Sequence, residues 1–472
     1  MIIKNILMYF MLVSAWSVLP AAGKEKPNIV MVFVDDMGWA DLSCFGGKSV
    51  NTRNIDRLAS EGLRFTNFYV NSPICSPSRV AITTGQYPQR WRITSYLEYR
   101  AKNRQRGMSD WLDPKAPVLA RELRKAGYAT GHFGKWHMGG QRDVGDAPLI
   151  SEYGFDESLT NFEGLGPRVL PLSNAYDGKP PKKHDLDSSK LGHGPISWQD
   201  RSVITSTFVN GALSFINRAA AAGQPFFVNV WPDDPHSPFF PPQAKRNSNN
   251  KRDLYHAVLD SMDEQFAPLF DRIRNDPKLR DNTLVIIASD NGPETGAGSS
   301  GPLRGYKGYL HEGGIRSPLI VWGPAFLANG KAGTINDTAF LSSIDLNASL
   351  YQFTSIQPVA RLDGETLIDT LLGKIETGRK SPLFFRRPPD RPGTADDPDL
   401  AVRDGIWKLV CAYDGSQSRL FDLKADPAES TDLSAAQPEI TERLRIAVID
   451  WNKTLPPDTS TAEPQKKGAE NR

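Results

Sequence analysis

The sequence has little cysteine and almost no net charge, and both shortages exclude classes of protein. Its three cysteines, Cys44, Cys75 and Cys411, lie far apart, without a CxxC pair or a zinc spacing. A disulfide-stapled miniprotein and a cysteine-bound zinc site are therefore excluded. The 56 basic residues against 54 acidic ones give a net charge of +2, which is not the broad basic field of a nucleic-acid binder. We predict no nucleic-acid partner, and any anion must be bound locally.

Long apolar runs are also missing, since no segment reaches the roughly 20 residues that cross a bilayer. The one candidate opens the sequence: Lys4 precedes an apolar run from Ile6 to Leu19, followed by Ala22 and Gly23. This layout is typical of a secretory signal peptide over residues 1–23; a membrane anchor is the weaker alternative, because the run is short. We predict an exported protein, periplasmic or extracellular, or in a lysosomal-type compartment of a eukaryote, without integral membrane association.

What the chain does contain is a set of short, fully apolar runs, which are typical of strands buried on both faces of a parallel sheet. The clearest runs are 28–34, 226–231, 283–288 and 318–322. Helical spacing of apolar residues lies between them, at 55–59, 118–123, 209–216 and 254–262. The alternation predicts an α/β fold, with a large mixed, mostly parallel sheet sandwiched by helices. In such a sheet ligands bind outside the carboxyl ends of the strands.

The character of the chain changes near residue 375. Beyond it, strand patterns at 400–403, 407–412 and 418–422 and a helical pattern at 439–451 predict a smaller C-terminal α+β subdomain built on an antiparallel sheet. We therefore expect a main domain over 24–375, the subdomain over 376–455 and a disordered tail over 456–472. The segment 164–199, rich in Gly, Pro, Ser and Lys, we interpret as a long surface excursion; loops of that length are usually functional or mobile.

Oxygen-bearing side chains directly follow two of the predicted strands. The run 28–34 leads into Asp35-Asp36, and the run 283–288 leads through Ser289 into Asp290-Asn291. Either motif alone could simply form a turn. Two acidic pairs at neighbouring strand ends would repel each other without a cation between them, and an all-oxygen set favours a hard ion over zinc. We predict one Ca²⁺ ion.

The segment Cys75-Ser76-Pro77-Ser78-Arg79 precedes a predicted helix at 77–82. A cysteine near a helix N-terminus lies in a site that attracts anions and lowers the pKa of a thiol. The alternative is a buried apolar cysteine. With Thr84-Gly85 a few residues on, the segment resembles the signature of the type I sulfatase family, which is formylglycine-dependent and arylsulfatase-like and belongs to the alkaline phosphatase superfamily. The resemblance implies that a maturation enzyme oxidises Cys75 to formylglycine (3-oxoalanine).

Further motifs match this family in its order along the chain. In the segment 134–139, Lys135 would hold the sulfate and His137 would contact the formylglycine. In the turn at 235–239, His236 would lie beside the leaving oxygen, and the segment 303–316 would supply a second sulfate-binding lysine, Lys307. The resemblance also implies the calcium ligands Asp35, Asp36, Asp290, Asn291 and the modified residue 75. The segments 403–410 and 420–427 resemble the family's C-terminal subdomain.

The resemblance implies hydrolysis of sulfate monoesters, with a sulfated carbohydrate or an aryl sulfate as substrate. One hydroxyl of the hydrated formylglycine, a geminal diol, would attack sulfur with support from Arg79. His236 would protonate the leaving oxygen, and His137 would take the proton that lets sulfate leave. Two alternatives stay open: a phosphatase or phosphodiesterase of the same superfamily, and an inactive binder of sulfated glycans.

Some positions depart from the family or match nothing in it. The departures are Ser43, Ser237 and His311, and His311 is close enough to Lys307 in sequence to be either a substrate contact or incidental. The excursion at 164–199, with Arg168, His184 and His193, has no counterpart that can be carried over. Cys44 and Cys411 are expected as ordinary thiols or as a single bridge.

Overall fold

The computed structural model describes residues 25–173, 181–391 and 397–461. The predicted signal peptide lies outside these ranges, as does residue 462 onward of the predicted tail. Within them, no helix combines the length and apolar character needed to span a membrane. The described start of the tail, residues 456–461, has no helix or strand, and its Thr461 N–H donates to the carbonyl of Gln105.

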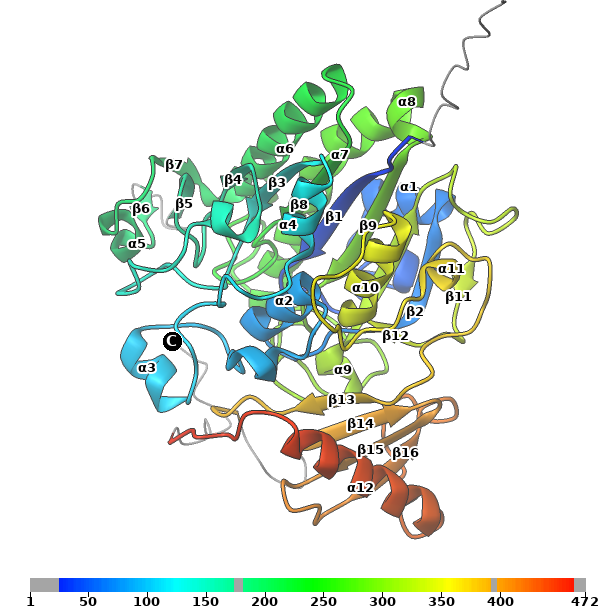
Figure 1. The fold of residues 1–472 in the computed structure, drawn as a ribbon. Helices are drawn as coiled ribbons and strands as arrows, with labels where there is room; N and C mark the ends of the chain where they lie inside the picture. Colours follow the sequence, from blue (N-terminus) through cyan, green and yellow to red (C-terminus); the bar gives the residue numbers. More distant parts are fainter. Residues whose placement is uncertain (1–24, 174–180, 392–396, 462–472) are drawn as a thin grey trace, which may run out of the picture.

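The main body is a nine-stranded sheet with strand order β11-β2-β10-β9-β1-β8-β3-β4, and β12 pairs with β2 (Figure 1). Its strands are β1 (Asn28–Val34), β2 (Leu63–Tyr69), β3 (Ala129–Gly134), β4 (Glu157–Leu159), β8 (Phe226–Trp231), β9 (Thr283–Ser289), β10 (Arg316–Trp322), β11 (Ile335–Asn336) and β12 (Leu341–Ser342). The central strands run parallel, and β10 is antiparallel to both β9 and β2. The predicted mixed, mostly parallel sheet is confirmed.

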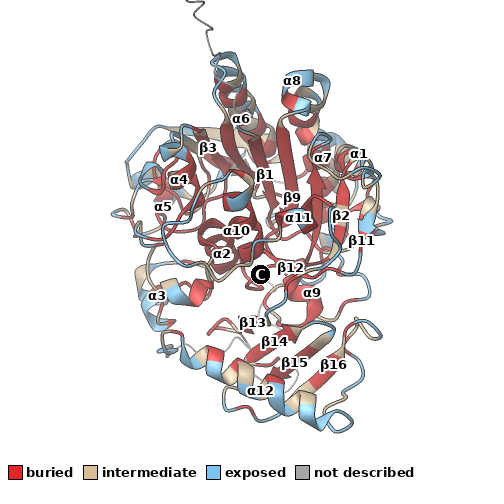
Figure 2. Ribbon diagram, turned by 45° about the vertical axis from the view of Figure 1, so that its right-hand side comes forward, coloured by how far each residue is buried: buried red, intermediate tan, exposed pale blue. Residues whose placement is uncertain are grey.

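Helices cover both faces of this sheet, because the side chains of each central strand alternate between two cores. Ile29, Met31 and Phe33 of β1 pack in the core that holds α2 (Cys75–Thr84), α4 (Leu119–Lys125) and α10 (Ser343–Phe353). Val30 and Val32 face the core of α1 (Arg53–Glu61), α6 (Ile204–Ala221) and α7 (Lys251–Asn275). Figure 2 shows the central strands, α2 and α10 as buried. The shorter helices are α3 (Arg100–Gln105), α8 (Pro277–Arg280), α9 (Glu312–Ile315) and α11 (Ile368–Leu371).

The excursion predicted at 164–199 is more structured than a surface loop. Its described residues form a three-stranded sheet from β5 (Arg168–Ser173), β6 (Lys182–Lys183) and β7 (Ile196–Asp200), with α5 (Leu186–Lys190) between the last two strands. Arg168 is buried and fixes this unit, since its guanidinium donates to the carbonyls of Ser188, at 2.7 Å, and of Gly192. The described residues of the segment therefore form an ordered wall beside the main sheet.

The C-terminal subdomain is a four-stranded antiparallel sheet, as predicted. It comprises β13 (Leu383–Arg386), β14 (Leu400–Asp404), β15 (Trp407–Cys411) and β16 (Arg419–Asp422), with α12 (Pro438–Lys453) packed on it. The strand β13 was not predicted. The exact boundary near residue 375 stays a prediction. Cys411 in this sheet and Cys44 in the main body are both free thiols, so the possible bridge is not formed.

The subdomain meets the main body through a buried ionic cluster. The ammonium of Lys408 on β15 lies 3.0 Å from a carboxylate oxygen of Glu312 on α9 and 2.9 Å from one of Glu429. His311 belongs to this cluster, because it is buried with Nδ1 3.4 Å from Glu429. Of its two suggested roles, this contact favours the incidental one over a substrate contact, because the ring is buried beside a carboxylate.

We expect Lys408→Ala to lower the free energy of unfolding by about 3–5 kcal/mol, because it leaves two buried carboxylates without their shared partner. The midpoint of urea unfolding measures this. Lys453→Ala is the matched control: its ammonium pairs with Asp450 at 3.0 Å, but the side chain is 71% exposed. The control should change stability by less than about 0.5 kcal/mol. Equal effects of the two substitutions would show that the buried cluster does not hold the subdomain in place.

Candidate active site

Two acidic pairs meet where β1 and β9 end. The strands are parallel neighbours with Val34 opposite Ser289, so the residues that follow lie side by side. The N–H of Asp36 donates to the carboxylate of Asp290 at 3.1 Å, and the amide of Asn291 donates to the carboxylate of Asp36 at 2.7 Å. All four side chains, including Asp35, are fully buried. The structure brings these predicted metal ligands together.

Cys75 is the first residue of α2 and faces this acidic group. Its sulfur lies 3.4 Å from Oδ1 of Asp35 and 3.9 Å from Oδ1 of Asp36. Burial raises the pKa of the thiol well above its usual value, and the charge of Asp35 adds to the effect. The predicted lowering of this pKa is therefore wrong. A helix N-terminus alone lowers the pKa of a thiol, but complete burial beside a carboxylate raises it by more.

Three cations surround the carboxylates. Arg79 lies one turn after Cys75 on α2, and its guanidinium is 2.7 Å from Asp290 and 3.4 Å from Asp35. Lys135 follows β3, with its ammonium 2.5 Å from Asp35. Lys307 comes from the loop before α9, with its ammonium 2.7 Å from Asp36. The predicted cationic residues therefore converge on one point, although together they span more than 200 residues of the sequence.

The two predicted histidines lie at the same place. The Nδ1–H of His236 donates to the carbonyl of Ser237 at 2.6 Å, so Nε2 is the free ring nitrogen and lies 3.6 Å from Asp36. His137 has a left-handed backbone (φ 55°) and a buried ring. Among the described residues, neither of its ring nitrogens has a hydrogen-bond partner. Burial, strengthened by a neighbouring lysine, lowers the pKa of both rings, so both are neutral at pH 7.

The acidic group fits a hard cation. One ligand atom from each of Asp35, Asp36, Cys75 and Asp290 lies within 4.8 Å of the other three. The Oδ1 atom of Asn291 is buried and accepts no hydrogen bond within the described ranges. Burial, and then the charge of Asp35, raises the pKa of Asp290 to about 8, even though the guanidinium of Arg79 lies 2.7 Å from this carboxylate. Carboxylate and amide oxygens in such a group are the ligands that Ca²⁺ prefers.

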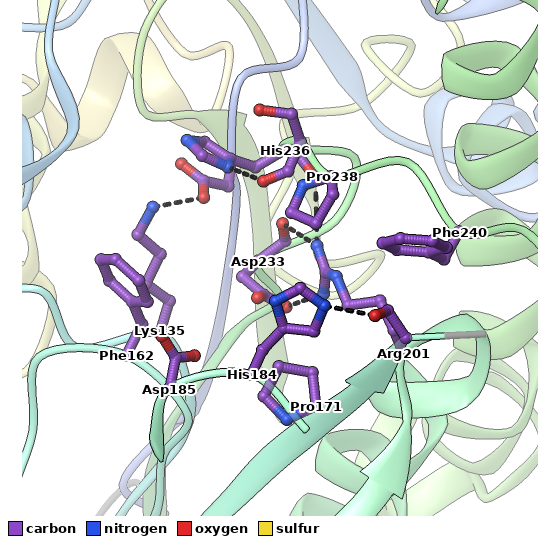
Figure 3. A pocket seen from close by; sticks show the side chains of 13 residues that line it. Lys135, Phe162, Pro171, His184, Asp185, Arg201, Asp233, His236, Pro238 and Phe240 are labelled. Carbon is purple, nitrogen blue, oxygen red and sulfur yellow. Dashed lines mark hydrogen bonds and ion pairs between the residues drawn. The ribbon is translucent and has the colours of Figure 1, made fainter. Parts of the chain in front are cut away.

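A pocket opens beside Lys135 and His236 and is lined by residues that sequence reasoning missed. These are Phe162, Pro171, Ser173, Asp185, Arg201, Asp233 and Phe240. Asp233 and Phe240 follow β8, which was a predicted strand. Their position just past the end of that strand could have predicted that they lie near the site. The others, and His184, come from segments whose approach to the strand ends no local pattern predicts. Figure 3 shows Lys135 and His236 on one side of this pocket and His184 and Phe240 on the other.

Comparisons with known proteins agree with this geometry. The profile of the sulfatase family matches residues 27–356. Human arylsulfatase A is 30% identical over 446 residues, which cover 88% of this chain and 81% of that protein. The N-acetylgalactosamine-6-sulfatase of Sus scrofa is 32% identical over 391 residues, which cover 78% of this chain and 71% of that protein.

A solved structure shares the fold. It is that of Ps i-CgsB in complex with a neocarrahexaose, and it superposes with a TM-score of 0.74 at 24% identity over 94% of this chain and 95% of the other. The profile and the two relatives each span most of the chain. The chain therefore belongs to the sulfatase family and is an enzyme that hydrolyses sulfate esters.

Proposed function

We propose that the enzyme removes sulfate from a sulfated carbohydrate, with a formylglycine made from Cys75 and one Ca²⁺ ion. The observation that carries this proposal is the position of Cys75, within 4 Å of Asp35 and Asp36. Relatives named as N-acetylgalactosamine-6-sulfatases, and the carbohydrate bound in the similar structure, support a sugar as substrate. The apolar start of the sequence supports an exported enzyme that meets such material outside the cytoplasm.

The ion would be held by Asp35, Asp36, Asp290 and Asn291, together with residue 75. When bound, it would supply positive charge next to the sulfate oxygens. Lys135 and Lys307 each contact a carboxylate of this group, so both ammonium groups lie within reach of an anion held there. Arg79 is fully buried and lies over the rings of Phe33 and Trp231, which fixes its guanidinium against Asp290.

The unmodified thiol is a poor nucleophile, because its raised pKa keeps it protonated. The formylglycine would supply an oxygen nucleophile in its place. Cys75 is 1% exposed, so we propose that the maturation enzyme modifies it before folding is complete. Both candidate metal clusters in the described part of the chain include Asp35 and Cys75, so they form one centre. This favours a sulfatase over the phosphatase alternative, which generally needs two metals.

The histidines would move the protons. With Nδ1–H held by the carbonyl of Ser237, Nε2 of His236 is the atom that can carry a proton to the leaving oxygen. A bound sulfate ester brings negative charge, which favours the protonated ring. His137 has two ring nitrogens without partners in the described structure, and one of them would accept the proton from residue 75 as sulfate leaves.

We expect His236→Ala to lower kcat about 10²- to 10⁴-fold on a sugar sulfate, the usual range for a lost general acid. The loss on an aryl sulfate should be at least about ten-fold smaller, because an activated phenolate leaves without a proton. Steady-state kinetics on both substrates measure the ratio. His256→Ala, on α7 and away from the pocket, is the control and should match the unchanged enzyme. Equal losses on the two substrates would rule out an acid role for His236.

The proposed function is tested with a panel of sulfated oligosaccharides and aryl sulfates, with free sulfate as the readout. Release of sulfate from at least one sugar sulfate is expected. If protein with complete formylglycine conversion binds sulfated sugars but releases no sulfate from any ester, the alternative of an inactive binder is correct.

A further inference from the structure

The pocket extends past the sulfate-binding residues to a wall made by the ordered excursion. Lys135 and His236 line the end nearest the carboxylates. Pro171, His184 and Asp185 of the excursion line the rest of the pocket, and Figure 3 shows Asp185 on the side of Lys135 and Phe162. In the proposed reaction, a sulfate bound near Lys135 would direct its leaving oxygen toward His236. The group attached to that oxygen must then lie against the excursion wall.

Asp185 has an unusual local structure that turns its carboxylate away from the chain. It precedes α5 with a left-handed backbone (φ 56°), and its side chain makes no capping bond to that helix. Instead its Oδ1 accepts a hydrogen bond of 2.9 Å from the amide of Gln141, a buried residue that also accepts from the N–H of Glu163 at 2.9 Å. Among the described residues, no hydrogen-bond donor reaches Oδ2. Asp185 therefore presents a fixed, unfilled acceptor to the pocket.

The remainder of this wall is flat and partly apolar. The rings of His184 and Phe240 lie with centroids 6.2 Å apart, and both line the pocket. His184 is held in place by Ser173, whose hydroxyl contacts its Nε2. Burial lowers the pKa of His184, and the charge of Lys182 adds to this, so the ring is neutral at pH 7. Flat rings beside a hydrogen-bond acceptor suit one face of a pyranose and its hydroxyls.

Two guanidinium groups in this part of the molecule already have carboxylate partners. Arg201 donates to Asp233 at 2.5 Å and lies 3.2 Å from Asp234. Arg142, close to Asp185, pairs with the buried Glu163. A second anionic group on the sugar that approaches Asp185 or Asp233 would therefore meet a carboxylate, and these two guanidinium groups are already paired.

We propose that Asp185 determines the specificity of this enzyme: it accepts a hydrogen bond from a hydroxyl of a neutral sugar that bears the sulfate. The same carboxylate disfavours a sugar ring with a second anionic group, such as a uronate or a disulfated ring. The substrate class is thus a monosulfated neutral pyranose. The inference rests on the proposed function and deepens it.

The test compares Asp185→Ala and Asp185→Asn with the unchanged enzyme on three substrates: a monosulfated neutral hexose, a sulfated uronate and an aryl sulfate. For Asp185→Ala, kcat/KM on the neutral hexose sulfate should fall about 10- to 100-fold, as expected for a lost hydrogen bond to a charged group. This loss should exceed the loss on the aryl sulfate at least ten-fold. Asp185→Asn should raise relative activity on the sulfated uronate. Equal losses on all three substrates, or no loss on the hexose sulfate, would overturn the inference.

Asp187→Ala is the matched control. Asp187 lies on α5, two residues away, but its carboxylate faces outward to Tyr99, at 2.9 Å, and the residue does not line the pocket. A binding experiment separates failure of this inference from failure of the proposed function. Titration of a monosulfated neutral hexose into Cys75→Ala protein should show weaker binding when Asp185→Ala is added. If the unchanged enzyme releases no sulfate, the proposed function fails, but binding that depends on Asp185 would still uphold the inference.

Discussion

Cys75→Ala is expected to lower turnover of every sulfate ester by about 10⁴-fold or more, the scale on which removal of a covalent nucleophile acts. The reason is the position of residue 75 in the site. Cys75 is the residue of α2 that lies against both Asp35 and Asp36, and alanine leaves no atom there that can attack sulfur. Sulfate release measured by ion chromatography gives the ratio.

The matched control for this substitution is Cys411→Ala. Cys411 is also buried and free, but it lies in β15 of the C-terminal sheet. Its replacement removes a thiol from a core of similar burial, so any loss of stability should be similar while turnover stays within about two-fold. Turnover by Cys75→Ala at the level of the control would remove residue 75 from the reaction.

The second large expected effect is the stabilisation of the folded protein by calcium, which can be measured without substrate. A ligand that binds only the folded state at 100 times its Kd adds about 2.7 kcal/mol to the free energy of unfolding. We expect Ca²⁺ to raise Tm of the unchanged protein. Asp290→Asn should abolish that rise, because it removes one of the carboxylates that meet at the ends of β1 and β9. Differential scanning calorimetry with and without Ca²⁺ measures both.

Asp450→Asn is the control for the calcium experiment, because this carboxylate lies on the exposed side of α12 and pairs only with Lys453 among the described ion pairs. It should leave the rise in Tm unchanged. A rise in Asp290→Asn as large as in the control would show that calcium binds elsewhere.

The sequence predicts the central strands well because they are buried on both faces. The strand β1 was predicted with its observed bounds, as was β8, and each is apolar except for one asparagine. The strand β2 was missed because Arg64 and Thr66 interrupt its pattern where the sheet is only partly covered. The strand β3 was missed because two glycines and His132 replace aliphatic residues; His132 is instead packed among Trp136, Phe155 and Trp231.

The site residues were found because their motifs lie at strand ends or in short recognisable segments. What the sequence could not predict depends on contacts between distant segments. The pKa of Cys75 is raised by burial and then by the charge of Asp35, forty residues away, and both outweigh the helix that Cys75 begins. Asp185 reaches the pocket because the three-stranded sheet, held in part by Arg168, places His184 and Asp185 beside the residues that follow β8.

The central claim is that residue 75 becomes the nucleophile of a sulfatase. Its most direct test is a single sample, made with a maturation enzyme, in which the peptide containing residue 75 is weighed and sulfate release from a sugar sulfate is measured. We predict a peptide mass about 18 Da below that of the thiol form, since oxygen replaces sulfur and two hydrogens are lost, and turnover in proportion to the converted fraction. Full turnover by protein that retains the Cys75 thiol would contradict the account.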